Sequence, residues 1–182
     1  MRSQRSVLGN RSPMRHTTNM PESKHVIPVS IQAVFPTNGG CALFLGDDTK
    51  VFVIYVDQMS GAAIAAASVE VPKIRPMTHD LMGSMLIGLG AKVERVVIND
   101  FRKDVFFARL ILSQENEVRE KAVVEVDSRP SDAIALALRQ DAPLFVSRKV
   151  WDGVEDMSPI LKKISEKGFL DDEPPFEEGF GI

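Results

Sequence analysis

Two short segments of the sequence carry residue types that can bind a phosphodiester. Each places an Arg directly before a Pro, then a hydroxyl side chain, then an Asp, and they span residues 75–81 and 127–133. Each segment is expected to open a helix, where backbone N–H groups lack partners and can receive a phosphate oxygen. The neighbouring Arg adds a planar guanidinium that matches phosphate geometry. We therefore predict phosphate binding by Arg75, Arg129 and Ser131.

The same segments hold carboxylates and a histidine that could act on the bound group. Carboxylates bind Mg²⁺ or Mn²⁺, and nucleases use such ions to activate water and stabilise the leaving oxygen. A histidine can act as a general base or as a metal ligand. The hypothesis assigns metal binding to Asp80, Asp127 and Asp132, and catalysis to these three together with His79. No organic cofactor is expected, because the sequence has no P-loop or GxGxxG segment.

A structural interpretation of the same residues stands beside the catalytic one. Asp and Ser at helix starts are ordinary caps, each contributing about 1 kcal/mol. Arg129 could pair with Asp127 or Asp132 only to fix the corner between a strand and a helix. In that case the domain would be a non-catalytic binding or regulatory module. A sensor that binds a small ligand in a cleft is a further alternative.

The elements that position these segments can be predicted from the hydrophobic pattern. Runs of β-branched residues between turn residues predict strands at 26–35, 41–45, 51–56, 93–98, 105–112, 123–127 and 144–146. Helical spacing of apolar residues predicts helices at 58–68, 78–89, 130–139 and 158–167. Thr78 is expected to be the N-cap of the second helix, Gly90 its C-terminal cap and Pro130 the first residue of the third helix.

The strand and helix pattern occurs twice. Residues 54–68 align without a gap with residues 124–138, and six of the fifteen positions are identical. The identities are Val56/Val126, Asp57/Asp127, Ala63/Ala133, Ile64/Ile134, Ala65/Ala135 and Ala67/Ala137. Ala-rich helices also resemble one another by chance. The prediction is an α+β fold built on a duplicated β-β-β-α unit, with mostly antiparallel strands and an intervening helix.

Charge divides the chain into three parts. The net charge of −3 combines +4 over residues 1–24, −2 over residues 25–170 and −5 over residues 171–182. We expect a disordered basic tail at 1–24, a folded domain at 25–168 and an acidic tail at 169–182. The basic tail also has the composition of an organelle transit peptide. Because the domain has no basic surplus, contact with nucleic acid phosphates must be local.

The cysteine content and the hydropathy of the sequence indicate in which cellular compartment the protein is expected. One cysteine, Cys41, cannot form an internal disulfide, which fits a reducing compartment and a cytoplasmic protein. The longest uncharged runs, 58–69 and 81–91, are shorter than the ~20 apolar residues of a membrane helix. No membrane association is expected. The run 81–91 has apolar residues over a wider part of the expected helix surface than packing against a single core requires. It therefore predicts a homodimer or a higher homo-oligomer.

Five blocks of the sequence resemble the bifunctional nuclease family. They are Arg75-Pro76-x-Thr78-His79-Asp80-Leu81, Leu89-Gly90-Ala91, Phe106-Phe107-Ala108-x-Leu110, the block from Asp127 to Ala137, and Ala142-Pro143-Leu144-Phe145-Val146. Ser128 departs from the Ala that is usual in the family. The resemblance covers about residues 27–155. It implies an α+β domain, often oligomeric, with activity on DNA and RNA in some members, and hence nucleic acid as the partner; it assigns no catalytic residues.

Overall fold

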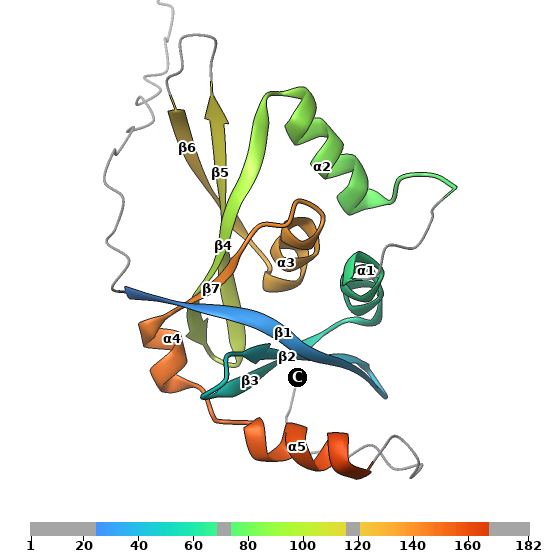
Figure 1. The fold of residues 1–182 in the computed structure, drawn as a ribbon, viewed down its shortest axis with the longest axis vertical. Helices are drawn as coiled ribbons and strands as arrows, with labels where there is room; N and C mark the ends of the chain where they lie inside the picture. Colours follow the sequence, from blue (N-terminus) through green and yellow to red (C-terminus); the bar gives the residue numbers. More distant parts are fainter. Residues whose placement is uncertain (1–24, 69–73, 116–120, 168–182) are drawn as a thin grey trace, which may run out of the picture.

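The computed structural model describes residues 25–68, 74–115 and 121–167. Within them, seven strands form one sheet in the order β3-β2-β1-β7-β4-β5-β6 (Figure 1). The strands are β1 (Val26–Thr37), β2 (Gly40–Gly46), β3 (Val51–Val56), β4 (Ala91–Arg102), β5 (Val105–Glu115), β6 (Lys121–Ser128) and β7 (Leu144–Ser147). The helices are α1 (Gln58–Ser68), α2 (Thr78–Gly88), α3 (Pro130–Leu138), α4 (Arg148–Gly153) and α5 (Ser158–Lys167). This mostly antiparallel sheet with its helices confirms the α+β class.

The central strand β7 separates two three-stranded meanders. Strands β1, β2 and β3 pair antiparallel in chain order on one side, and β4, β5 and β6 do the same on the other. β7 pairs antiparallel with β1 and parallel with β4, so β1 and β4 run in opposite directions. Each meander ends in a strand that leads into a helix, α1 after β3 and α3 after β6. The two predicted sets of three strands are confirmed, and their matching order is compatible with an internal duplication.

Helices cover the two faces of the sheet unequally. On one face α1 and α3 pack against each other, and α2 packs against α3 and β4. The main core lies between these helices and the sheet and includes Ile64 from α1 and Ile134 from α3, both fully buried. On the other face α5 covers the meander of β1, β2 and β3 (Figure 1), where Leu161 and Ile164 pack against Phe44. No helix in the described residues is long and apolar enough to cross a membrane.

The helix boundaries in the structure agree closely with the predicted ones, except at a few residues. α1 and α5 have the predicted bounds. Thr78 is not the N-cap of α2; it is the first helical residue, and Met77 is the N-cap. The reason is that the Asp80 carboxylate, in the first turn of α2, accepts a hydrogen bond from the Met77 backbone N–H at 2.8 Å. This bond gives a backbone donor at the helix start an acceptor from within the helix. Gly90 follows α2 with a φ of 68°, a left-handed conformation that suits glycine after a helix end.

Two other features were not predicted. α4 has only six residues, which is too short for a hydrophobic period to appear. β4 continues to Arg102, beyond the predicted strand end, because the chain reverses within a tight turn at Lys103 and Asp104. Both turn residues have positive φ without being glycine, so the usual sequence signal of a short hairpin is missing. The predicted tails at 1–24 and 169–182, and the domain end at Gly168, lie outside the described residues.

Candidate functional site

The starts of three helices meet at one group of side chains, on the face of the sheet that α1, α2 and α3 cover. We call it the helix-start cluster; its members are Asp57 before α1, His79 in α2, Arg129 before α3 and Asp132 in α3. Arg129 donates to both oxygens of Asp132, from Nε to Oδ2 at 2.9 Å and from Nη2 to Oδ1 at 3.2 Å. Its Nη1 reaches Asp57 Oδ2 at 3.3 Å. His79 Nε2 lies 3.4 Å from Asp132 Oδ1. Two of the predicted helix starts, those of α2 and α3, therefore meet here.

Local sequence fixes the backbone at each of these corners. Asp57 caps α1, because its carboxylate accepts the Ser60 backbone N–H at 2.8 Å and the Ser60 hydroxyl at 2.7 Å. Arg129 is the extended N-cap of α3, with φ −67° and ψ 142°, and Pro130 follows at the first helical position. A residue before proline favours this extended conformation. Asp132 is then in the first turn of α3, where the helix dipole favours a carboxylate.

Hydrogen bonds set the charge states of the cluster. The contact with Arg129 lowers the pKa of Asp132, and the contact with His79 acts in the same direction. The Ser60 backbone N–H is the main cause that lowers the pKa of Asp57. Asp132 in turn raises the pKa of Arg129. At neutral pH the cluster thus holds one guanidinium between two carboxylates.

The cluster is open to solvent on its charged side. The Arg129 side chain keeps 64% of its surface exposed and Asp57 keeps 51%, whereas His79 keeps 14%. The pair of Arg129 with Asp132, which the structural alternative drawn from the sequence also predicts, is present in the structure but is exposed to solvent. The guanidinium is accessible to an incoming anion, and the imidazole lies behind it against the protein.

The other predicted site residues have separate partners. Asp80 Oδ1 lies 3.0 Å from Arg139 Nε, and both side chains are largely buried. Asp127 Oδ1 lies 3.3 Å from Arg109 Nη1 on the exposed surface of β5 and β6. Ser131 is 6% exposed and Arg75 is exposed. The structure thus brings His79, Arg129 and Asp132 together and pairs Asp80 and Asp127 with other arginines.

The three aspartates predicted to bind a divalent metal ion do not lie together. Asp80, Asp127 and Asp132 each face a different arginine, a cation that competes with Mg²⁺ or Mn²⁺ for the same oxygens. Among the described residues, no three His, Cys, Asp or Glu side chains are grouped closely enough to hold a metal ion. The predicted ligand set does not fit a preformed metal centre, and metal dependence stays a prediction.

Asp57 is the member of the cluster that sequence reasoning missed. Its signal was present, because Asp57 aligns with Asp127 in the internal repeat. The structure shows that Asp57, rather than its repeat counterpart Asp127, contacts Arg129.

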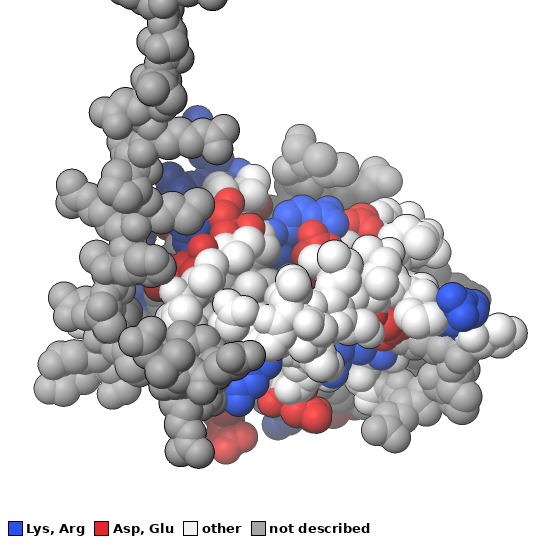
Figure 2. Space-filling view, turned by 90° about the horizontal axis from the view of Figure 1, so that it is seen from above, with Lys and Arg blue, Asp and Glu red and all other residues white. Residues whose placement is uncertain are grey.

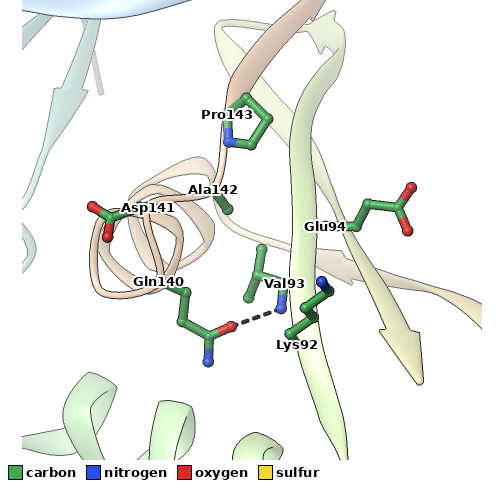
Figure 3. A pocket seen from close by; sticks show the side chains of 7 residues that line it. All are labelled: Lys92, Val93, Glu94, Gln140, Asp141, Ala142 and Pro143. Atoms are coloured by element: carbon green, nitrogen blue, oxygen red, sulfur yellow. Dashed lines mark hydrogen bonds between the residues drawn. The ribbon is translucent and has the colours of Figure 1, made fainter. Parts of the chain in front are cut away.

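A separate hollow lies at the opposite end of α3. It is an open hollow of about 320 Å³ beside β4, and its lining includes Lys92, Glu94, Gln140 and Pro143 (Figure 3). The Gln140 side-chain oxygen accepts the Val93 backbone N–H at 2.7 Å across its floor. Charges of both signs line it, and none of the predicted site residues does. It does not have the features of a phosphate site.

Comparison with known proteins shows to which family the sequence belongs. A model of the bifunctional nuclease domain matches residues 43–157, a range that contains the whole helix-start cluster. The chain belongs to the bifunctional nuclease domain family. The family expected from the sequence blocks is thus confirmed, and the described elements from β2 to α4 are elements of this domain.

Individual relatives of this bifunctional nuclease domain are bacterial and plant proteins. An uncharacterized protein of Mycobacterium tuberculosis is 35% identical over 97 residues, which are 53% of this chain and 54% of that protein. Bifunctional nuclease 2 of Oryza sativa subsp. japonica is 29% identical over 122 residues, 66% of this chain and 37% of that protein. Bifunctional nuclease 1 of Arabidopsis thaliana is 32% identical over 95 residues, 52% of this chain and 29% of that protein. The chain spans about half the length of the mycobacterial relative and about a third of the plant relatives.

Proposed function

We propose that this domain hydrolyses phosphodiester bonds of DNA or RNA at the helix-start cluster. Membership of the bifunctional nuclease domain family supports a nuclease-related function. The observation that carries the assignment of the site is the contact between His79 and Asp132 beside the exposed guanidinium of Arg129. A proton acceptor, a group that orients it and an anion-binding cation are thereby adjacent, and these can activate the attacking water and hold the phosphate of a phosphodiester.

Each residue has a chemical role in this proposal. If Nε2 donates its hydrogen to Asp132, the lone pair of the His79 ring is on Nδ1, and this is the atom proposed to take a proton from the attacking water. Imidazole suits this step because it exchanges protons near neutral pH. Arg129 uses three of its N–H groups on Asp132 and Asp57 and presents the remaining donors to a phosphate oxygen. The 3.4 Å contact between His79 and Asp132 is expected to tighten when substrate is bound.

The proposed activity is tested with labelled single-stranded DNA and RNA and the full chain. Asp132→Asn, purified in parallel, is expected to lose about 100-fold or more in rate, a size typical of losing general acid–base assistance. Lys149→Gln is the matched control, because Lys149 pairs with an aspartate, Asp100, outside the cluster. Equal cleavage by wild type and Asp132→Asn would identify a contaminating nuclease and overturn the site. An arm with EDTA, then Mn²⁺ or Mg²⁺, tests the predicted metal dependence.

A non-catalytic role has one observation in its favour. Arg129 joins Asp57 before α1 to Asp132 in α3, which is what a purely structural connection between two helices would look like. In that case the purified wild type would show no turnover, and Arg129→Lys would leave nucleic acid binding unchanged. In the proposed site the same substitution removes the bidentate fork and reduces turnover, because a lysine ammonium is a point charge.

A further inference from the structure

Asp57 is the member of the helix-start cluster that has no part in the proposed proton transfer. Its Oδ2 lies 3.3 Å from Arg129 Nη1, whereas His79 contacts Asp132. The Ser60 backbone N–H and hydroxyl hold the Asp57 carboxylate in place at the start of α1. A fixed charge this close to the proposed phosphate site acts on any anion that binds there.

The guanidinium of Arg129 has donors left for such an anion. Its Nε–H and one N–H of Nη2 are used on Asp132, and one N–H of Nη1 is used on Asp57. Each terminal nitrogen of a guanidinium carries two hydrogens. The second N–H of Nη1 and the second N–H of Nη2 can therefore donate to the oxygens of a phosphate group.

A phosphate bound to these donors has a carboxylate on either side. Two acceptors on the two hydrogens of one nitrogen lie about 5 Å apart, because each N···O distance is about 3 Å and the N–H bonds diverge by about 120°. A phosphate oxygen on Nη1 is then about 5 Å from Asp57 Oδ2, and one on Nη2 is about 5 Å from Asp132 Oδ1. Both carboxylates repel a negative charge over this distance.

The cluster is negatively charged before an anion arrives. Hydrogen bonds from Ser60 lower the pKa of Asp57, and Arg129 lowers the pKa of Asp132, so both carboxylates are ionised at neutral pH. With His79 neutral, as a proton acceptor must be, the two carboxylates outweigh the one guanidinium. Residues 25–170 do not offset this charge, since their own net charge is −2. In the view of Figure 2, the Lys and Arg side chains lie beside Asp and Glu and form no continuous basic area on the described surface.

Internal and terminal phosphate groups respond differently to this arrangement. An internal phosphodiester has one negative charge, shared by two oxygens, and its other two oxygens are uncharged esters. A terminal phosphomonoester has a charge of about −1.5 to −2 at pH 7 and three charged oxygens. We propose that Asp57 is a specificity-determining residue, which allows internal phosphodiesters to reach Arg129 and disfavours terminal phosphate groups. The proposal rests on hydrolysis at the helix-start cluster and adds the class of phosphate group on which the cluster acts.

Two small anions test the discrimination without any turnover. Dimethyl phosphate is a monoanion that represents the diester, and methyl phosphate at pH 8 is a dianion that represents the monoester. Binding to the full chain is measured by NMR from the signal of the His79 ring. Methyl phosphate should bind about 10-fold more weakly than dimethyl phosphate, the effect of one added like charge a few ångströms away at a solvent-facing site.

Asp57→Asn should bring the two affinities within about twofold of each other, because the cluster is then neutral. Asn is as good a helix cap as Asp and still offers an oxygen to the Ser60 backbone N–H, so the start of α1 is kept. Asp156→Asn is the matched control. Asp156 accepts the Ser158 backbone N–H at 2.9 Å and the Ser158 hydroxyl at 2.6 Å at the start of α5, on the other face of the sheet. This control should retain the preference for dimethyl phosphate.

The outcomes separate this proposal from the proposed hydrolysis. Equal affinities of the wild type for the two anions would overturn the discrimination and leave the phosphate site standing. A preference that Asp57→Asn retains in full would overturn the role of Asp57. A wild type whose His79 signal shifts with neither anion would overturn the phosphate site itself, and the discrimination with it.

Discussion

His79 Nε2 and Asp132 Oδ1 are 3.4 Å apart although 53 positions separate the two residues in the chain. The contact exists because α2 packs against α3 with both helix starts at the same end. A Cβ at Gly83 would lie 3.8 Å from a Leu136 methyl carbon and 3.5 Å from the Gln140 amide nitrogen, which are ordinary van der Waals distances, so α2 faces α3 here at normal packing distance. The proposed proton acceptor and the group that orients it thus depend on helix packing.

A double-mutant cycle tests whether His79 and Asp132 act as a unit. His79→Ala and Asp132→Asn are each expected to reduce nuclease turnover about 100-fold, and the double variant should lose little more than either single variant. The physical reason is that Asp132 acts by orienting the His79 ring, and has nothing to orient once the ring is gone. Rate losses that multiply in the double variant would show two independent roles.

Two arginines at α3 should differ in their contribution to folding. Arg129→Ala is expected to lower the free energy of unfolding by about 1 kcal/mol or less, because its pair with Asp132 is solvent-exposed. Arg139→Ala should cost about 2–4 kcal/mol. Arg139 lies 17% exposed against Asp80, and its Nη1 also donates to the Ala66 backbone oxygen of α1 at 3.1 Å.

Urea denaturation of the two purified variants measures this difference. Similar small losses would mean that the Arg139 contacts are as well solvated as those of Arg129. A large loss for Arg129→Ala would favour the structural interpretation of the cluster, since a residue used for binding phosphate should be dispensable for folding.

The α+β class and most of the strands and helices could be predicted from the sequence because their signals are local. Strand alternation, the Ala-rich helices and the proline at the start of α3 all lie within short windows, and the repeat supplied the two meanders. Pairings of charges were less predictable, because they depend on which helices pack together. Asp80 and Asp127 were grouped with Asp132 by motif, but Arg139 and Arg109 lie against them from elements distant in the chain or across the sheet. Asp57 joined the cluster only through the packing of α1 on α3.

Gly61 should be intolerant of even one methyl group. A Cβ there would overlap Cys41 Sγ and lie 2.6 Å from Cys41 Cβ, so α1 would have to move away from β2. We expect Gly61→Ala to destabilise the protein by about 1–3 kcal/mol, the range for overpacking. Gly153→Ala is the matched control, because nothing lies within 4 Å of its added Cβ and helical alanine is favoured by about 0.5–1 kcal/mol. Thermal melting of both variants and the wild type tests this prediction. An unchanged melting temperature for Gly61→Ala would refute the tight contact between Gly61 and Cys41.

Acid should weaken the helix-start cluster in a way that depends on Asp132. Its contacts with Arg129 and His79 lower its pKa in the folded state below the ordinary value of about 3.9. A lowered carboxyl pKa gives stability that is present above the unfolded-state pKa and is lost as the pH falls through the folded-state pKa. The contribution should stay below about 1 kcal/mol, since 38% of the Asp132 side chain is exposed and solvent screens the pair.

Melting temperatures of the wild type and Asp132→Asn measured from pH 7 down to pH 2 check this sign. The wild type should be the more stable protein at neutral pH, and the difference should shrink below pH 4, because the protonated carboxyl resembles the amide. Arg129→Gln should remove most of the difference at neutral pH, since Arg129 is the main cause of the lowered pKa. A difference that grows toward low pH would mean that Asp132 is destabilised as a carboxylate in the folded protein. That result would contradict the ion pair from which the proposed site is built.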